Sequence, residues 1–258
     1  MADQLPGHLD AFIEQSAAVA DWLDDLPAEA LDSPSSLDGW DVRMLVAHLA
    51  LVRNGLERAL SVRSTEPAIT ASQFVGRYRP AVEAITKSTL ALYDSQTPAE
   101  LIARLRDADS LREAGVGVSD RTTVLGGRGP ITAVDWATTR LVEVVIHSDD
   151  LARSFPEREP VPLHRAALAT AVRTLAEIFA TAHPGRSVEV RIAPFVAVQA
   201  VPGPRHTRGT PPNVVETDPL TWIRVATGRA VFADAVADGR IAASGNRADL
   251  TPYLPVLS

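Results

Sequence analysis

Two histidines and one glutamate are the residues whose types and spacing could do chemistry. Glu143 and His147 are four residues apart in an apolar-periodic stretch, so on a helix they lie one turn apart on one face and could share one ion. His48 lies in a second strongly apolar stretch, and helix packing could place it opposite that pair. Two imidazoles and one carboxylate leave coordination positions open, which is the composition of a catalytic zinc site rather than a structural one. Without a cysteine ligand, such a set could also accept another divalent metal.

These residues also have an interpretation without a metal. A lone histidine in an apolar helix is often a hydrogen-bonded core residue, and the spacing Glu-x-x-x-His occurs by chance in many helices. Asp149 or Asp150 could orient the imidazole of His147 through its second nitrogen, or could cap a neighbouring element. Arg140 could pair with Glu143 or lie on a solvated face. The spacing alone leaves both interpretations open.

The composition narrows the class of protein. The 258 residues include no cysteine, which excludes disulfides, iron–sulfur clusters and a thiol nucleophile of the protein's own. A net charge of −7 without a basic block argues against a nucleic-acid partner. No apolar run approaches the roughly 18 residues of a membrane span, and the N-terminus is acidic where a secretory signal is basic. We therefore expect a cytoplasmic protein with no membrane partner, and the oligomeric state stays open.

The N-terminal part of the chain has the periodicity of a helical bundle. Apolar residues recur at a spacing near 3.6 in five segments, which are about 8–24, 41–61, 72–94, 97–107 and 132–155. Asp41 and Thr97 are good N-caps, and Pro98 suits a first helical position. The Gly-rich segment before the last helix contains GGRG at 126–129 but no phosphate-binding GK[ST] motif, so we expect a flexible connection there. The pattern predicts a four-helix bundle with one long connection.

A Pro- and Glu-rich stretch at 155–162 predicts a linker, after which the periodicity changes. Helices are expected at 163–183 and 218–228, strands at 187–193, 196–201, 213–217 and 240–244, and a further short helix before the last strand. The predicted fold is therefore α+β with two domains, a helical bundle over 1–157 and a small α+β domain over 158–258.

Four segments carry a resemblance to a known family: PS at 34–35, GW at 39–40, VAHL at 46–49 and RLVEVVIHSDDL at 140–151. The chain resembles the mycothiol-dependent maleylpyruvate isomerases of actinobacteria, within the wider DinB-like helical bundles. The resemblance implies that His48, Glu143 and His147 are three metal ligands. The stretch TDPLTWIRVATGR at 217–229 is similar to the sterol-carrier-like domain appended to many members, so the resemblance covers nearly the whole chain.

The resemblance also implies an activity. Zinc is expected to bind a low-molecular-weight thiol, mycothiol, and to lower its pKa so that the thiolate attacks a small electrophile. A chain without cysteine is compatible with a thiol supplied from outside. In the isomerase, the thiolate would add to the double bond of maleylpyruvate, allow rotation and leave to give fumarylpyruvate. Arg224 and Arg229 are the catalytic candidates for holding the substrate carboxylates, although five residues apart they would not share one helix face.

Two other functions compete with the thiol-dependent enzyme. One is a lipid or sterol carrier with a structural or vestigial metal site, whose C-terminal domain would bind an apolar ligand in a tunnel. Residues that could line such a tunnel are Phe195, Val196, Val198 and Trp222. The few large aromatics and the short strands of that domain argue against a wide lipid cavity. The other is a metal-free interaction module, in which the three ligand-like residues would be a relic.

Overall fold

The computed structural model describes residues 3–204 and 212–257, and the chain divides into two compact units, Met1–Ala167 and Leu168–Ser258. The first unit is helical and the second contains a four-stranded sheet, which confirms the predicted α+β class. Within the described residues, every helix is too short or too polar to span a lipid bilayer. The division falls inside a helix, and the expected domain boundary between 157 and 158 stays a prediction.

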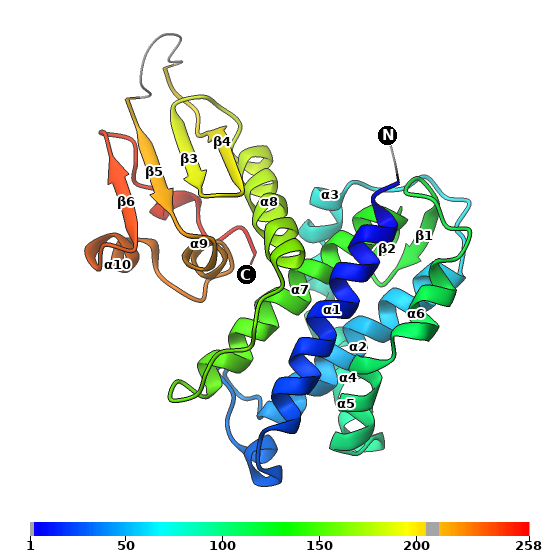
Figure 1. Ribbon diagram of the computed structural model, residues 1–258. Coiled ribbons are helices and arrows are strands. Elements are labelled where there is room, and N and C mark those ends of the chain that lie inside the picture. The colour runs from blue at the N-terminus through cyan, green and yellow to red at the C-terminus, as the bar shows by residue number, and fades with distance from the viewer. Residues whose placement is uncertain (1–2, 205–211, 258) are drawn as a thin grey trace. The chain divides into compact units, whose positions relative to one another are not determined.

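The helical unit contains seven α-helices, one 3-10 helix and one short hairpin within its described residues. Figure 1 shows their arrangement. They are α1 Leu5–Asp24, η1 Ala28–Asp32, α2 Val42–Ser61, α3 Ala71–Gly76, α4 Tyr78–Ser95, α5 Pro98–Arg106, α6 Ala108–Gly115, β1 Thr123–Gly126, β2 Gly129–Thr132 and α7 Ala133–Ser154. The N-caps follow from the sequence. The Asp41 carboxylate accepts from the Met44 backbone N–H at 2.6 Å, and Thr97 forms a capping box with Glu100.

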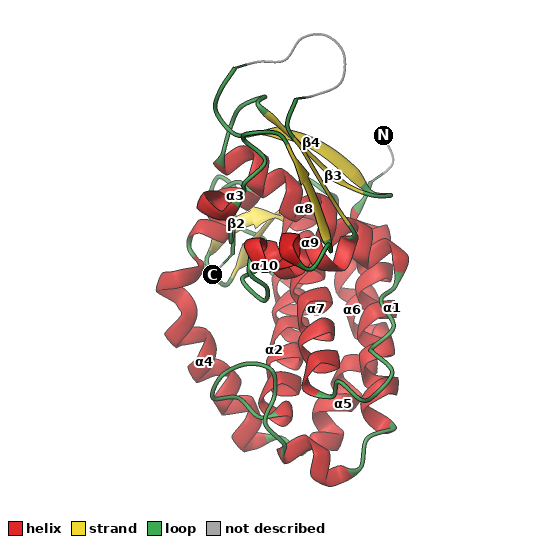
Figure 2. Cartoon of the chain, turned by 90° about the vertical axis from the view of Figure 1, so that its left-hand side faces the viewer, coloured by secondary structure: helices red, strands yellow, loops and turns green. Residues whose placement is uncertain are grey.

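Helices α1, α2 and α7 form the centre of this unit. Helix α7 packs against both α1 and α2, and α2 also contacts α4, α5 and α6 (Figures 1 and 2). The packed faces are rows of aliphatic side chains, among them Leu45 and Leu49 on α2 and Leu141 and Val145 on α7, all at most 1% exposed. Because the two helices pack along their lengths, polar side chains among these rows are brought together inside the bundle.

The helix expected over 72–94 is interrupted. The structure has α3 and α4 with a break at Arg77, whose backbone N–H bonds to Phe74 in place of a regular helical partner. Pro80 explains the break, because a proline lacks the N–H for the bond to the residue four before it and its ring crowds that carbonyl. Within the first turn of α4 the missing N–H has no cost.

The expectation of a flexible Gly-rich connection before α7 is also wrong, because much of this segment is regular structure. Gly115 ends α6, where a Cβ would lie 2.7 Å from Leu9 of α1. Residues 123–126 and 129–132 pair as an antiparallel hairpin with a two-residue loop, Gly127 and Arg128. Strands of four residues give too short an alternation to be distinguished from a loop by sequence pattern.

The C-terminal unit is a mixed sheet with helices, as expected. Its elements are α8 Arg165–Ala182, β3 Val188–Ile192, β4 Val196–Ala200, β5 Val214–Thr217, α9 Pro219–Ala226, α10 Phe232–Ala237, β6 Ile241–Ser244 and η2 Thr251–Tyr253. The strand order is β4-β3-β5-β6, in which β3 and β5 are parallel and the other two pairs are antiparallel (Figure 1). Alternate residues of β3 are buried, and Phe179 of α8 packs edge-to-face on Trp222 of α9 at 5.7 Å between ring centroids. Asp218 caps α9 by accepting from two backbone N–H groups.

Candidate metal centre

The structure brings His48, Glu143 and His147 together inside the helical unit. His48 lies on α2, and the other two residues lie one turn apart on α7. The His48 Nε2 atom is 3.3 Å from Glu143 Oε2, and the His147 Nε2 atom is 3.8 Å from the same oxygen. One ligand atom from each of the three residues lies within 4.8 Å of the others. We call these three residues the triad.

The second nitrogen of each imidazole is oriented by a buried neighbour. Thr89 of α4 donates its hydroxyl hydrogen to the Ile85 carbonyl at 3.0 Å, so its oxygen is left to accept from His48 Nδ1–H at 3.3 Å. The Asp150 carboxylate, fully buried, accepts from His147 Nδ1–H at 2.9 Å. Both hydrogen bonds place the ring proton on Nδ1, so the neutral form of each imidazole directs a lone pair from Nε2 toward Glu143.

This donor set fits a divalent metal ion. Two imidazole Nε2 lone pairs face one carboxylate oxygen at 3.3 and 3.8 Å, and a cation among these three atoms would be attracted to all of them. Neutral imidazole nitrogens and a carboxylate oxygen are the ligands of mononuclear zinc sites with open positions. Burial is the main reason that the pKa of His48 is lowered, which disfavours a proton on its Nε2.

Arg140 keeps the triad carboxylate ionised. Burial is the largest influence on Glu143 and acts to raise its pKa. The Arg140 guanidinium, 3.0 Å from Glu143 Oε1, acts with the two histidines to hold that pKa well below its usual range. Arg140 is itself only 8% exposed and stacks over the Trp136 ring at 4.2 Å. The sequence allowed Arg140 either to pair with Glu143 or to lie on a solvated face, and the structure shows that it pairs with Glu143.

Two protein-family models match the chain. Residues 12–152 match the model described as the mycothiol maleylpyruvate isomerase N-terminal domain, which is more than half of the chain. The chain belongs to this family. Residues 164–256 match a second model, described as a bacterial SCP ortholog. The sequence-based resemblance to mycothiol-dependent maleylpyruvate isomerases, with an appended sterol-carrier-like domain, is confirmed.

Solved structures of this family share the fold. A crystal structure of the mycothiol-dependent maleylpyruvate isomerase is 18% identical, covers 95% of this chain and 96% of its own, and superimposes with a TM-score of 0.59. A histidine-to-alanine mutant of such an isomerase is 19% identical over the same shares, with a TM-score of 0.56. No curated protein matches the chain significantly. At this identity the likeness shows the fold alone.

Among the residues that contact the triad histidines of this family member, Thr89 carries no signal in the sequence. Thr89 lies on α4 outside any motif, and only the packing of α4 against α2 reveals its contact with His48. Asp149 and Asp150 were equivalent candidates from spacing, and the structure places Asp150 on His147. Trp40 stands with its ring edge-on to His48 at 5.5 Å between centroids, so its indole lies against the triad.

Replacing Asp150 by asparagine is expected to weaken zinc binding by about 10- to 100-fold, the usual effect of losing a carboxylate behind a histidine ligand. The neutral amide accepts a weaker hydrogen bond from His147 Nδ1–H and no longer raises the electron density at Nε2. Zinc affinity measured by competition with a chelating dye tests this. Asp135→Asn, about two turns before Glu143 on α7, is the matched control. Equal affinity of the Asp150→Asn and Asp135→Asn proteins would contradict the role of Asp150.

Arg224 and Arg229, the predicted carboxylate-holding residues, lie in the C-terminal unit and not in the unit that contains the triad. Arg224 is in the last turn of α9, and its carbonyl accepts from the Arg229 backbone N–H at 2.7 Å. The Arg229 guanidinium donates to the Thr227 carbonyl at 3.0 Å. Both side chains are half-buried. Their role in holding a substrate stays a prediction.

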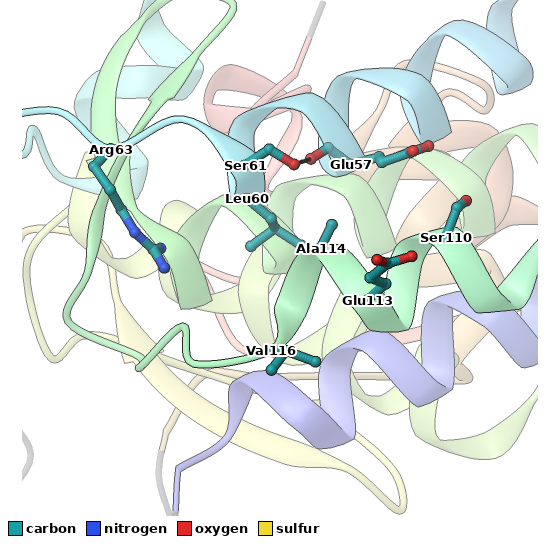
Figure 3. Close-up of a pocket in the computed structure, with 8 residues that line it drawn as sticks. All are labelled: Glu57, Leu60, Ser61, Arg63, Ser110, Glu113, Ala114 and Val116. Atoms are coloured by element: carbon teal, nitrogen blue, oxygen red, sulfur yellow. Dashed lines mark hydrogen bonds between the residues drawn. The ribbon is translucent and has the colours of Figure 1, made fainter.

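A cavity of about 390 Å³ lies between α2 and α6 (Figure 3). Its lining combines the carboxylates of Glu57 and Glu113, the guanidinium of Arg63 and the apolar side chain of Val116. Glu57 is nine residues beyond His48 on α2, which is roughly 13 Å along the helix axis. The cavity is therefore separate from the triad, and its mixed charges indicate no single class of ligand.

Proposed function

We propose that the protein is a metal-dependent enzyme that uses mycothiol as cosubstrate for isomerisation or S-transfer on a small electrophile. His48, Glu143 and His147 would hold zinc or another divalent ion. The observation that carries the proposal is the convergence of two oriented Nε2 lone pairs on one ionised carboxylate. Membership of the mycothiol maleylpyruvate isomerase N-terminal domain family supports the choice of thiol. The absence of cysteine from the chain supports a thiol supplied from outside.

A divalent ion at the triad would lower the pKa of a coordinated thiol and so favour the nucleophilic thiolate at neutral pH. The residues around it would prepare that site. Thr89 and Asp150 fix the tautomers of the two imidazoles, and Arg140 keeps Glu143 ionised. Each of these partners is already in place, so binding would require little rearrangement of the side chains.

The proposal is tested with cobalt(II) in place of zinc, since a thiolate bound to cobalt gives a sulfur-to-metal absorption band in the near ultraviolet. Titration of the cobalt-loaded protein with mycothiol is expected to produce this band. The zinc-loaded protein is expected to consume maleylpyruvate or a bimane electrophile only when mycothiol is present. Chelator-treated protein is the matched control. No band on titration, together with equal consumption by the chelator-treated protein, would contradict the proposal.

The lipid-carrier alternative has less support from its own residues. Trp222 is 1% exposed and packs edge-to-face on Phe179, so it belongs to the core of the C-terminal unit. Phe195 lies in the turn between β3 and β4, and Val196 and Val198 are half-buried on β4. Among the four proposed tunnel residues, Trp222 therefore has a packing role that needs no ligand.

A further inference from the structure

Arg128 is a partly buried cation that has no anionic partner among the described residues. It occupies the two-residue loop between β1 and β2, and its guanidinium lies over the Phe74 ring at 4.2 Å and the Tyr78 ring at 5.3 Å. Within the described part of the chain, its side chain has no carboxylate within ion-pair range and no hydrogen-bond acceptor. A guanidinium carries five N–H donors in a planar fork. The cation–π contacts stabilise the charge but leave these donors unused.

A short series of contacts connects Arg128 to the triad. The Phe74 and Trp136 rings are perpendicular neighbours, 5.3 Å apart, and we call them the aromatic pair. Arg128 stacks on Phe74, and Arg140 stacks on Trp136 at 4.2 Å. Arg140 in turn contacts the triad carboxylate of Glu143. Two guanidiniums therefore stack on the two rings of the aromatic pair, one already paired with the triad and one available.

The charge environment agrees with this placement. Burial, followed by the positive charge of Arg140, lowers the pKa of Arg128 to about 10, while Glu143 acts in the opposite direction. Arg128 is thus within electrostatic range of the triad carboxylate and its arginine, and it stays protonated at neutral pH. A buried like-charge neighbour is unfavourable for Arg128, and a bound anion would relieve that repulsion.

The hairpin holds Arg128 firmly in this position. A Cβ at Gly126 would lie 3.0 Å from Trp136 and 3.1 Å from Phe74, so glycine lets the loop approach the aromatic pair. Gly129 has φ +131°, a conformation that favours glycine, and the Arg77 guanidinium donates to the Arg128 carbonyl at 3.0 Å. A side chain held by its backbone in this way is pre-organised for a ligand.

We propose that Arg128 is a specificity residue whose guanidinium binds a carboxylate of the small electrophile that reacts at the triad. The inference rests on the proposed function and adds the residue that would select electrophiles bearing a carboxylate. The planar fork of a guanidinium matches a carboxylate in a bidentate arrangement, and this cation is the unpaired one of the two on the aromatic pair. The proposal places a carboxylate-binding group within the same unit as the triad.

Calorimetric titration of the zinc-loaded protein with maleate tests this proposal, and the neutral diamide of maleate is the comparison ligand. Wild type is expected to bind maleate and not the diamide. Arg128→Gln is expected to weaken maleate binding about tenfold or more, as loss of a charge-assisted pair does, and Arg128→Lys is expected to restore part of it. Zinc content and the thermal midpoint are expected to stay unchanged. Arg121→Gln, at an exposed arginine just before β1, is expected to bind as wild type.

Turnover kinetics provide a second measurement, because a purely structural role of Arg128 would not change the preference between charged and neutral electrophiles. In Arg128→Gln, KM for a carboxylate-bearing electrophile is expected to rise, while the rate with a neutral bimane electrophile and mycothiol stays near wild type. Absence of maleate binding by wild type, or equal binding by Arg128→Gln, would overturn the inference. Loss of thiol-dependent turnover in wild type would instead remove the proposed function, because maleate binding is measured without turnover.

Discussion

Alanine at His48, Glu143 or His147 is expected to reduce bound zinc from about one ion per chain to nearly none, because each change removes one of only three protein ligands. The three ligand atoms lie within 4.8 Å of one another, and among the described residues this is the one group of three or more such side chains close enough to share an ion. Elemental analysis of the purified proteins measures this directly. Mycothiol-dependent turnover is expected to be lost with the metal in all three variants.

Glu143→Ala also removes the partner of buried Arg140, so a loss of metal there could reflect local unfolding. Glu143→Gln keeps the side-chain volume and hydrogen-bonding capacity, and it is expected to lose zinc while retaining the circular dichroism of wild type. His164→Ala is the matched control, since His164 pairs with Glu14 at 3.0 Å on the surface without a third ligand. Wild type that takes up no zinc, or a His48→Ala protein that keeps it, would show that the triad is not a metal site.

The triad and its neighbours show which residues of a site can be predicted from patterns in the sequence. The pair Glu143 and His147 is visible because a helix places residues four apart on one face. His48, 95 residues before Glu143, was a candidate because packing of its apolar helix could place it opposite the pair, and the resemblance to a family then implied that it does. Asp150 was one of two candidates that the spacing on α7 offered, and the structure selects it over Asp149. Thr89 was out of reach for a different reason. A hydrogen bond between helices depends on their rotation and spacing, which arise from packing and leave no fixed interval in the sequence.

In the fold, too, local features could be predicted from the sequence and features that depend on distant contacts could not. Helix starts at Asp41, Thr97 and Asp218 were predictable because a cap is a local interaction of one side chain with the next turn. The break at Arg77 could have been anticipated from Pro80, which the periodic pattern outweighed. The β1–β2 hairpin could not, because Gly126 is required by contacts with the aromatic pair, which is distant in the sequence. Arg128 was therefore mistaken for part of a flexible connection.

Arg53 is the residue whose loss is expected to destabilise the helical unit most among its buried polar groups. It lies on α2 with 1% exposure, and apart from His48 the other buried side chains of that helix are apolar. Its guanidinium pairs with Glu57, donates to the Asp107 carbonyl at 2.6 Å and also donates to the Ser110 hydroxyl. Asp107 is the N-cap of α6, so one buried cation connects α2 to the junction of α5 and α6.

Arg53→Ala is therefore expected to lower the free energy of unfolding by about 3 kcal/mol, since it leaves a partly buried carbonyl and hydroxyl without their donor and opens a cavity. Arg58→Ala, at an exposed arginine on the same helix, is the control and is expected to stay within about 0.5 kcal/mol of wild type. Urea unfolding followed by circular dichroism measures both, with an unchanged slope as the condition for comparing midpoints. Equal midpoints for the two variants would show that the α5–α6 junction holds without Arg53, and that apolar packing of α2 alone fixes its position.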